Sequence, residues 1–209
     1  QFFYQKVTAA SPGPFARSFT ELPSHVFYYL REHGLIIFES EAQIWGPGGI
    51  TLMSQILDFA EQLKVKTIYT AAAQAMSISH REQVRVLGAA TQEDLRDALL
   101  PHGIEILKEG QIAGLNGLLL GFAGVRKIQA ACLMATMPLY AQMMPNPKAS
   151  REIIRVFERV LGVQVDMSEI DEAVEHMEET MSEIEEKIRT TFSSINVHIL
   201  SILFQIYIG

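Results

Sequence analysis

The sequence has few of the residues that most chemical functions require. It holds one cysteine in 209 residues, so no intrachain disulfide can form, and the apolar run around Cys132 predicts a buried thiol in a reducing compartment. The six histidines lie too far apart along the chain for a local metal-binding spacing. No nucleophile elbow, phosphate-binding lysine loop or HExxH motif occurs. We therefore expect no metal, no cofactor and no catalytic residue.

Basic residues are also scarce. The chain has 17 Lys and Arg against 24 Asp and Glu, a net charge of −7, which argues against nucleic-acid binding because phosphate contacts need a basic face. Residues 166–187 alone hold ten acids and one base, a net of −9, which leaves +2 for all other residues. No signal-peptide pattern is present, and we expect no membrane span. The first residue is Gln1 rather than Met, so we expect the sequence to be a fragment.

Strand and helix patterns alternate along residues 34–162. Helical patterns begin near Ile50, Thr91, Asn116 and Asn146, the last with Pro147 at its first turn and Gly162 as its stop. We expect residues 1–24, which contain three of the eight prolines together with Gly13, to be loop or edge structure. The order predicts a mainly parallel, three-layer α/β/α sandwich over residues 1–165. The expected strands are Gly34–Glu39, Lys66–Ala71, Arg85–Ala89, Gly103–Leu107 and Ala130–Met134.

A different kind of helix is expected over residues 166–192, where apolar residues follow a heptad spacing and the remainder is mostly Glu. Two interpretations stay open: the helix lies on its own domain, or it packs on another subunit. The second makes the apolar row an oligomer interface, made of Ile170, Val174, Met177, Met181, Ile184 and Ile188. Residues 193–209 form an apolar C-terminal tail, too short to span a bilayer, that must be buried against protein.

Three short segments resemble ligand sites but have simpler structural interpretations. Gly46–Gly49 and Gly114–Gly117 suit tight turns into helices, although glycine-rich helix starts also bind anions. Ser77–His80 places a serine beside a histidine in a polar loop after a strand, where α/β sheets hold ligands. No acid stands at a recognisable position to support that pair.

The most specific motifs of the sequence lie between Gly110 and Gly162. They include Gly110-Gln-Ile-Ala-Gly-Leu-Asn-Gly117, Pro138-Leu-Tyr140, and Pro145-Asn-Pro-Lys-Ala149 leading to Leu161-Gly162. In this order they resemble the proteasome-assembly-chaperone family, which is widespread in archaea, and the likeness covers roughly residues 27–175. The residues that carry the motif are Gly110, Gly114, Asn116 and Gly117.

The resemblance implies an α/β fold similar to nucleoside phosphorylases without their active site. It also implies a cytoplasmic homo-oligomer and, for some members, help in assembling the proteasome core. Family members often end in a hydrophobic–Tyr–any-residue triplet that enters pockets between proteasome α subunits. Here Ile206, Tyr207 and Ile208 match that triplet, and Gly209 follows, so the tyrosine stands one place early.

Three hypotheses follow. The first is a non-enzymatic, oligomeric assembly chaperone for the proteasome core or a related complex, with the proteasome α subunits or core particle as partner. The second is a small-molecule enzyme or sensor with its ligand near Gly46–Gly49, Ser77–His80 and Gly114–Gly117. The third is a structural scaffold joined through its coiled helix.

Overall fold

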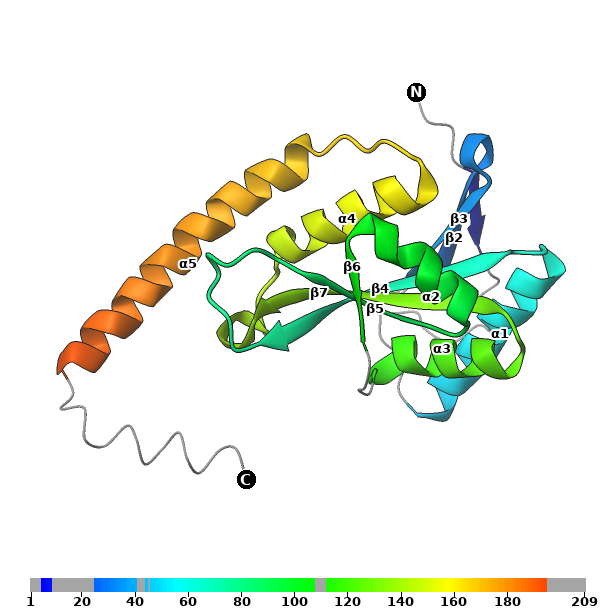
Figure 1. Ribbon diagram of the computed structural model, residues 1–209, viewed down its shortest axis with the longest axis horizontal. Coiled ribbons are helices and arrows are strands. Elements are labelled where there is room, and N and C mark those ends of the chain that lie inside the picture. The colour runs from blue at the N-terminus through cyan, green and yellow to red at the C-terminus, as the bar shows by residue number, and fades with distance from the viewer. Residues whose placement is uncertain (1–4, 9–24, 41–43, 45, 108–111, 195–209) are drawn as a thin grey trace, which may run out of the picture. The chain divides into compact units, whose positions relative to one another are not determined.

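The chain forms a mixed α/β fold with a mainly parallel sheet (Figure 1). The computed structural model describes residues 5–8, 25–40, 44, 46–107 and 112–194. Its helices are α1 Pro47–Gln62, α2 Glu93–Leu99, α3 Gly114–Val125, α4 Pro147–Leu161 and α5 Ser168–Ser194. Its strands are β1 Gln5–Thr8, β2 His25–Leu30, β3 Leu35–Ser40, β4 Thr67–Met76, β5 Val86–Ala90, β6 Ile104–Ile106 and β7 Gln129–Pro138.

The chain divides into two compact units. The first contains Gln1–Ile68, Ala90–Leu95 and Glu109–Ala131, and the second contains Tyr69–Ala89, Arg96–Lys108 and Cys132–Gly209. The boundaries expected from the sequence, at residues 165 and 192, stay a prediction. No helix within the described ranges is both long and apolar enough to cross a membrane.

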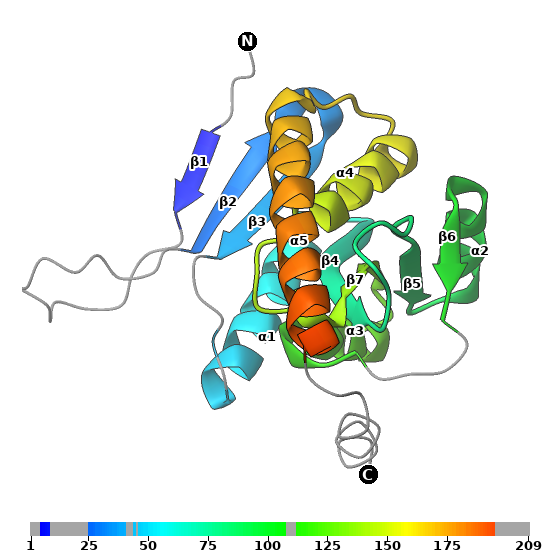
Figure 2. The same ribbon diagram turned by 90° about the vertical axis from the view of Figure 1, so that its left-hand side faces the viewer.

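The first unit contains an antiparallel sheet in the order β1-β2-β3, visible in Figure 2. Neither this sheet nor β2 was predicted, although β1 agrees with the edge structure expected before residue 24. In the β2–β3 register Phe27 pairs with Phe38, and the Phe27 ring also lies 4.6 Å from the ring of Phe59 on α1. This aromatic contact joins the sheet to a core of α1 and α3 side chains that includes Leu57 and Ala123, both fully buried.

Two glycines let α1 and α3 begin in close contact with their surroundings. A Cβ at Gly49 would lie 2.6 Å from the carbonyl oxygen of Ile44 and 2.9 Å from Leu115 of α3. A Cβ at Gly117 would lie only 1.8 Å from the carbonyl oxygen of Ile112, closer than any real contact. The structural interpretation of the Gly46–Gly49 and Gly114–Gly117 segments accounts for these glycines without a ligand.

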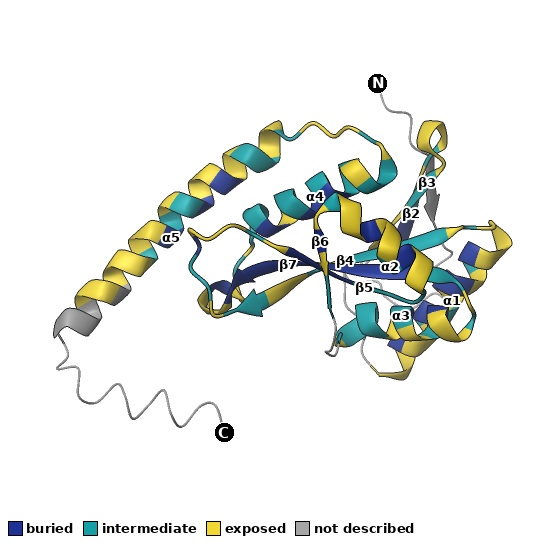
Figure 3. Ribbon diagram, viewed as in Figure 1, coloured by how far each residue is buried: buried dark blue, intermediate teal, exposed yellow. Residues whose placement is uncertain are grey.

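A four-stranded sheet in the order β4-β7-β5-β6 has most of its residues in the second unit. Its strands β5 and β6 are parallel, and β7 lies between β4 and β5. From Ala130 to Pro138 every residue of β7 is buried, as a central strand covered on both faces requires (Figure 3). This strand delivers Pro138 to the site described below.

Helix α4 matches its sequence signals in detail. The Asn146 side chain accepts a hydrogen bond of 3.0 Å from the backbone N–H of Ala149, and Pro147 is the first helical residue. Gly162 ends the helix in the left-handed conformation, with φ of 67°. These local signals fix the helix at both ends, and Figures 1 and 2 show α5 beside it.

Candidate functional site

A buried histidine, His80, lies at the centre of the most densely connected polar site in the described chain. It is only 4% exposed, in the loop between β4 and β5. The hydroxyl of Tyr140, sixty residues away in the chain, accepts a 2.9 Å hydrogen bond from the His80 backbone N–H. The same hydroxyl lies 3.0 Å from the ring nitrogen Nδ1 of His80. One side chain therefore holds this loop by both its backbone and its ring.

These contacts are satisfied by one arrangement of the protons on His80. The Tyr140 oxygen accepts from the backbone N–H, so its own proton is available for Nδ1. A neutral imidazole then carries its proton on Nε2, which lies 3.4 Å from the hydroxyl of Ser182 on α5. Ser182 donates its proton to the Glu178 carbonyl at 2.8 Å and not to the histidine. The serine is consequently not activated as a nucleophile.

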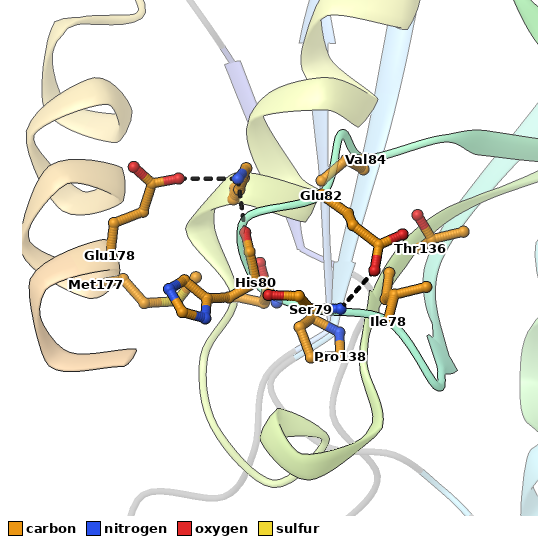
Figure 4. Close-up of a pocket in the computed structure, with 11 residues that line it drawn as sticks. Ile78, Ser79, His80, Glu82, Val84, Thr136, Pro138, Met177 and Glu178 are labelled. Atoms are coloured by element: carbon orange, nitrogen blue, oxygen red, sulfur yellow. Dashed lines mark hydrogen bonds and ion pairs between the residues drawn. The ribbon is translucent and has the colours of Figure 1, made fainter. Parts of the chain in front are cut away.

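Lys148, near the start of α4, extends the network to α5. Its Nζ donates to the His80 carbonyl at 2.7 Å and forms an ion pair of 2.8 Å with Glu178 (Figure 4). The hydrogen bond from Lys148 lowers the pKa of the Glu178 carboxyl below its ordinary 4.5, against an opposite effect of burial. Because the Lys148 side chain is only 15% exposed, this ion pair is partly shielded from solvent.

The Ser77–His80 segment, considered as a place for a Ser/His pair, brings no serine of its own to the His80 ring among the described contacts. The Ser79 hydroxyl accepts a hydrogen bond from the Arg81 backbone N–H, while the Ser79 backbone N–H donates to Glu82 at 2.8 Å. These contacts make a local turn, and His80 points instead to Tyr140 and Ser182. The contact between His80 and Tyr140 was not expected, because nothing in the sequence near residue 80 indicates Tyr140.

A small hollow lies beside His80, and Figure 4 shows its lining. It leaves about 10 Å³ for the centre of a water molecule, which is room for about one water and not for a metabolite. Within the described ranges, no group of three or more His, Cys, Asp or Glu side chains is placed to hold a metal ion. Cys132 is fully buried, and burial raises the pKa of its thiol. The polar groups around His80 hold together the β4–β5 loop, Tyr140, the start of α4 and helix α5.

Most side chains in the apolar row of helix α5 pack inside the chain. Val174, Met177 and Met181 are buried, and the two methionines pack with Met137 and Ala141 in one cluster (Figure 3). These side chains, expected to form an oligomer interface, therefore pack against residues of their own chain. This is the first of the two interpretations that the sequence left open. Ile184 packs at the edge of the cluster.

The remaining members of the row have different positions. Ile170 is half-buried, and the side chain of Ile188 lies outside the described residues. Ion pairs support the helix at both ends of its docked part, from Arg151 to Asp171 at 3.0 Å and from Arg81 to Glu185 at 2.9 Å. Joining of subunits through α5 stays a prediction.

The connection between β7 and α4 exposes a group of apolar side chains. Leu139 and Tyr140 are each 49% exposed, and Met143 is 91% exposed. Ala141 and Met144 of the same turn point inward to the methionine cluster. We call the exposed group, Leu139, Tyr140 and Met143, the apolar knuckle. It contains part of the Pro138-Leu-Tyr140 motif.

The other expected site residues are only partly placed. Gly114 has a φ of 72° at the first position of α3, and Asn116 and Gly117 lie in its first turn. Gly110 and the expected partner-binding residues Ile206, Tyr207 and Ile208 lie outside the described residues. Their assignments therefore remain as the sequence left them.

The fold and the site define a class of mixed α/β protein with a hydrogen-bonded centre at His80 and an exposed apolar group at Leu139, Tyr140 and Met143. Comparison of the sequence with protein-family models matches residues 11–185 to the PAC2 family. The chain belongs to this family, which confirms the resemblance seen in the sequence.

Relatives and solved structures are consistent with this assignment. The uncharacterized protein MJ1210 of Methanocaldococcus jannaschii is 27% identical over 161 residues, which are 76% of this chain and 61% of that protein. The chain thus spans less than two thirds of that relative. The crystal structure of Pyrococcus furiosus PbaB, an archaeal proteasome activator, aligns with a TM-score of 0.69 and 26% identity over 82% of this chain and 75% of that one.

Two further structures share the fold at lower identity. PbaA of Pyrococcus furiosus, an archaeal homologue of proteasome-assembly chaperone, has a TM-score of 0.67 at 19% identity, covering 94% of this chain and 79% of that chain. The Mycobacterium tuberculosis proteasome-assembly chaperone homologue Rv2125 has a TM-score of 0.65 at 21% identity, covering 86% and 75%.

Proposed function

We propose that this chain is a non-enzymatic assembly chaperone that acts on the proteasome core particle or a related complex. The observation that carries the proposal is the match of residues 11–185 to the PAC2 family, together with the 26% identity to PbaB. The hydrogen-bond network around His80 supports a protein-binding role over catalysis, since its polar groups are used to hold segments of the chain together. The proposed setting is cytoplasmic.

The proposed working surfaces are apolar. The Ile206–Ile208 triplet is proposed to enter a pocket on the proteasome α subunits, with Tyr207 as the anchor because tyrosine combines a large apolar body with one polar tip. A homo-oligomer would present several such segments at once and gain avidity. The proposed sheet architecture is the three-layer, nucleoside-phosphorylase-like one, without its active site.

Binding of purified proteasome core to the immobilised protein tests the proposal. We expect capture of the core by the intact chain, and loss of capture on Tyr207→Ala at unchanged oligomer mass. The matched control is Tyr29→Ala, which removes an exposed aromatic ring from β2 and should leave capture intact. No capture by the intact chain would refute the proteasome as partner, whereas capture that survives Tyr207→Ala would place the contact elsewhere.

A further inference from the structure

We propose that, in the absence of a partner, the apolar segment Ile199–Ile208 folds back onto the apolar knuckle of the same chain. The observation that starts this inference is the knuckle itself. Met143 is 91% exposed and has Leu139 and Tyr140 beside it, each half exposed. Methionine is usually among the most buried residue types, so a protein gains stability when such a group is covered.

The turn that carries the knuckle is held in place by contacts with the rest of the chain. Tyr140 is held by its two contacts with His80, and the backbone N–H of Met144 donates to the Ala141 carbonyl at 2.9 Å. Ala141 and Met144 anchor the turn in the methionine cluster beneath it. A preformed apolar surface of this kind binds a chain segment without losing conformational entropy of its own.

The chain beyond α5 is long enough to return along the helix to the knuckle. Ile184 of α5 packs on the same methionine cluster as Ala141, so this part of the helix lies close to the knuckle. The helix then continues to Ser194, ten residues further, which is about 15 Å of helix. The fifteen residues 195–209 span up to about 50 Å when extended. The segment is therefore long enough to return past Ile184 and reach Met143.

The composition of the segment fits the knuckle. Residues 195–209 contain no Asp, Glu, Lys or Arg, so no charge would be desolvated on docking. Phe204 and Tyr207 are suited to Met143 and Tyr140, because methionine sulfur and aromatic rings both pack favourably against aromatic rings. The segment on the same chain also has an advantage in effective concentration over that of a second copy.

Covering the knuckle would give the segment two alternative positions, one on its own chain and one on a partner. Release from the knuckle would then precede binding elsewhere, and the apparent affinity for any partner would be the intrinsic affinity multiplied by the fraction of chains in which the segment is undocked. This inference concerns the isolated chain and does not depend on the identity of the partner.

Cross-linking between introduced cysteines tests the inference on the full-length chain without any partner. Met143→Cys is combined with Ile202→Cys or with Ile206→Cys and treated with a short bis-maleimide. The native Cys132 is fully buried and does not compete. The matched control pairs the same tail cysteines with Val125→Cys, a residue that is 82% exposed and lies in the other compact unit. At the two described positions, Met143 and Val125, the changes replace exposed apolar side chains.

We expect the Met143 pairs to cross-link within one chain about tenfold faster than the Val125 pairs, at a rate independent of dilution. Equal rates for the two pairs would overturn the proposal. Covalent dimers that disappear on dilution would also overturn it, by assigning the occupant to a second copy.

Chymotrypsin provides a second measurement, since it cleaves after Phe204 and Tyr207. We expect Leu139→Ser with Met143→Ser to accelerate that cleavage severalfold, and Val125→Ser to leave it unchanged. Unchanged cleavage in the knuckle variant would contradict docking at this site, whatever the result with proteasome.

Discussion

At the scale of single residues, the polar site depends on one hydroxyl group. Tyr140 accepts from the backbone N–H of His80 and contacts its ring, and these two segments are sixty residues apart in sequence. Without that oxygen, a buried backbone N–H loses its partner, which is costlier than the loss of an exposed hydrogen bond.

Tyr140→Phe should therefore lower the free energy of unfolding by about 1–3 kcal/mol. Denaturant unfolding measures the change, and Tyr29→Phe, at a comparably exposed tyrosine on β2, serves as the control with an expected change below about 0.5 kcal/mol. Equal effects of the two substitutions would show that the His80 contacts contribute nothing particular.

Two glycines of α3 give a sharper contrast. At Gly117 an added Cβ would meet the Ile112 carbonyl oxygen at 1.8 Å, whereas at Gly121 it would meet nothing within 4 Å. We expect Gly117→Ala to destabilise by about 1–3 kcal/mol through overpacking, and Gly121→Ala to stabilise by about 0.5–1 kcal/mol through helix propensity. Thermal unfolding of the two variants measures both signs, and a neutral Gly117→Ala would contradict the close approach at the start of α3.

Residue types were more predictable from the sequence than their contacts. The Asn146 cap and the Gly162 stop were predicted because both act within a few residues of their own position. The pairing of His80 with Tyr140 was not, because it depends on how β7 passes the loop after β4. Local chemistry is encoded locally, while side-chain partners are set by topology.

At the scale of elements, α5 illustrates how one pattern permits two kinds of packing. A heptad row of apolar residues fits either a second helix of another subunit or a surface of its own chain. The deciding residues, Met137 and Ala141, belong to other elements and show no spacing relation to α5. Strand β2 was missed for a related reason, since its pairing with β3 across the Gly34 turn is clear only when both strands are considered together.

Met181 tests the intrachain packing of α5. It is only 1% exposed, so Met181→Ala should cost about 2–5 kcal/mol through lost burial and the cavity left behind. Glu179→Ala, on the exposed side of the same helix, should change stability by less than about 0.5 kcal/mol. Denaturant unfolding compares them, and a small effect of Met181→Ala would mean that the helix is not held by this cluster.

The Lys148–Glu178 pair predicts a pH dependence. The folded-state pKa of Glu178 is lowered from 4.5, so the unfolded chain takes up the proton at higher pH than the folded chain. The contribution of the pair is present above pH 4.5 and is lost as the pH falls through the lower, folded value. The stability difference between the native protein and Glu178→Gln should therefore be largest near neutral pH and shrink in acid. A difference that grows in acid would contradict this sign.

At the scale of the whole molecule, the class of fold was predictable and its detailed organisation was not. Alternating helix and strand patterns predicted a mixed α/β protein with a mainly parallel sheet. They did not reveal the antiparallel β1-β2-β3 sheet or the two compact units, since these depend on long-range pairings. The proposed role of Ile206–Ile208 in a proteasome pocket came from family resemblance alone.

The proposed homo-oligomer is tested by the mass of the particle in solution. One chain has a mass of 23.4 kDa, and light scattering should give a multiple of it. Because Met177 and Met181 belong to the chain's own core, substitutions there would unfold α5 and would not report on subunit contacts. Ile170→Lys changes a half-buried member of the row and is the better probe of α5 as an interface. A mass of 23.4 kDa for the native chain would contradict oligomerisation.

The exposure of Met143 also gives this protein a chemical reporter. It is the most exposed of the nine methionines, and the others are buried or half-buried. Mild peroxide converts accessible methionine to its sulfoxide, a polar group that disfavours apolar contacts. Oxidation should therefore begin at residue 143, be followed by mass spectrometry as the gain of one oxygen, and slow down whenever another molecule or segment covers that thioether.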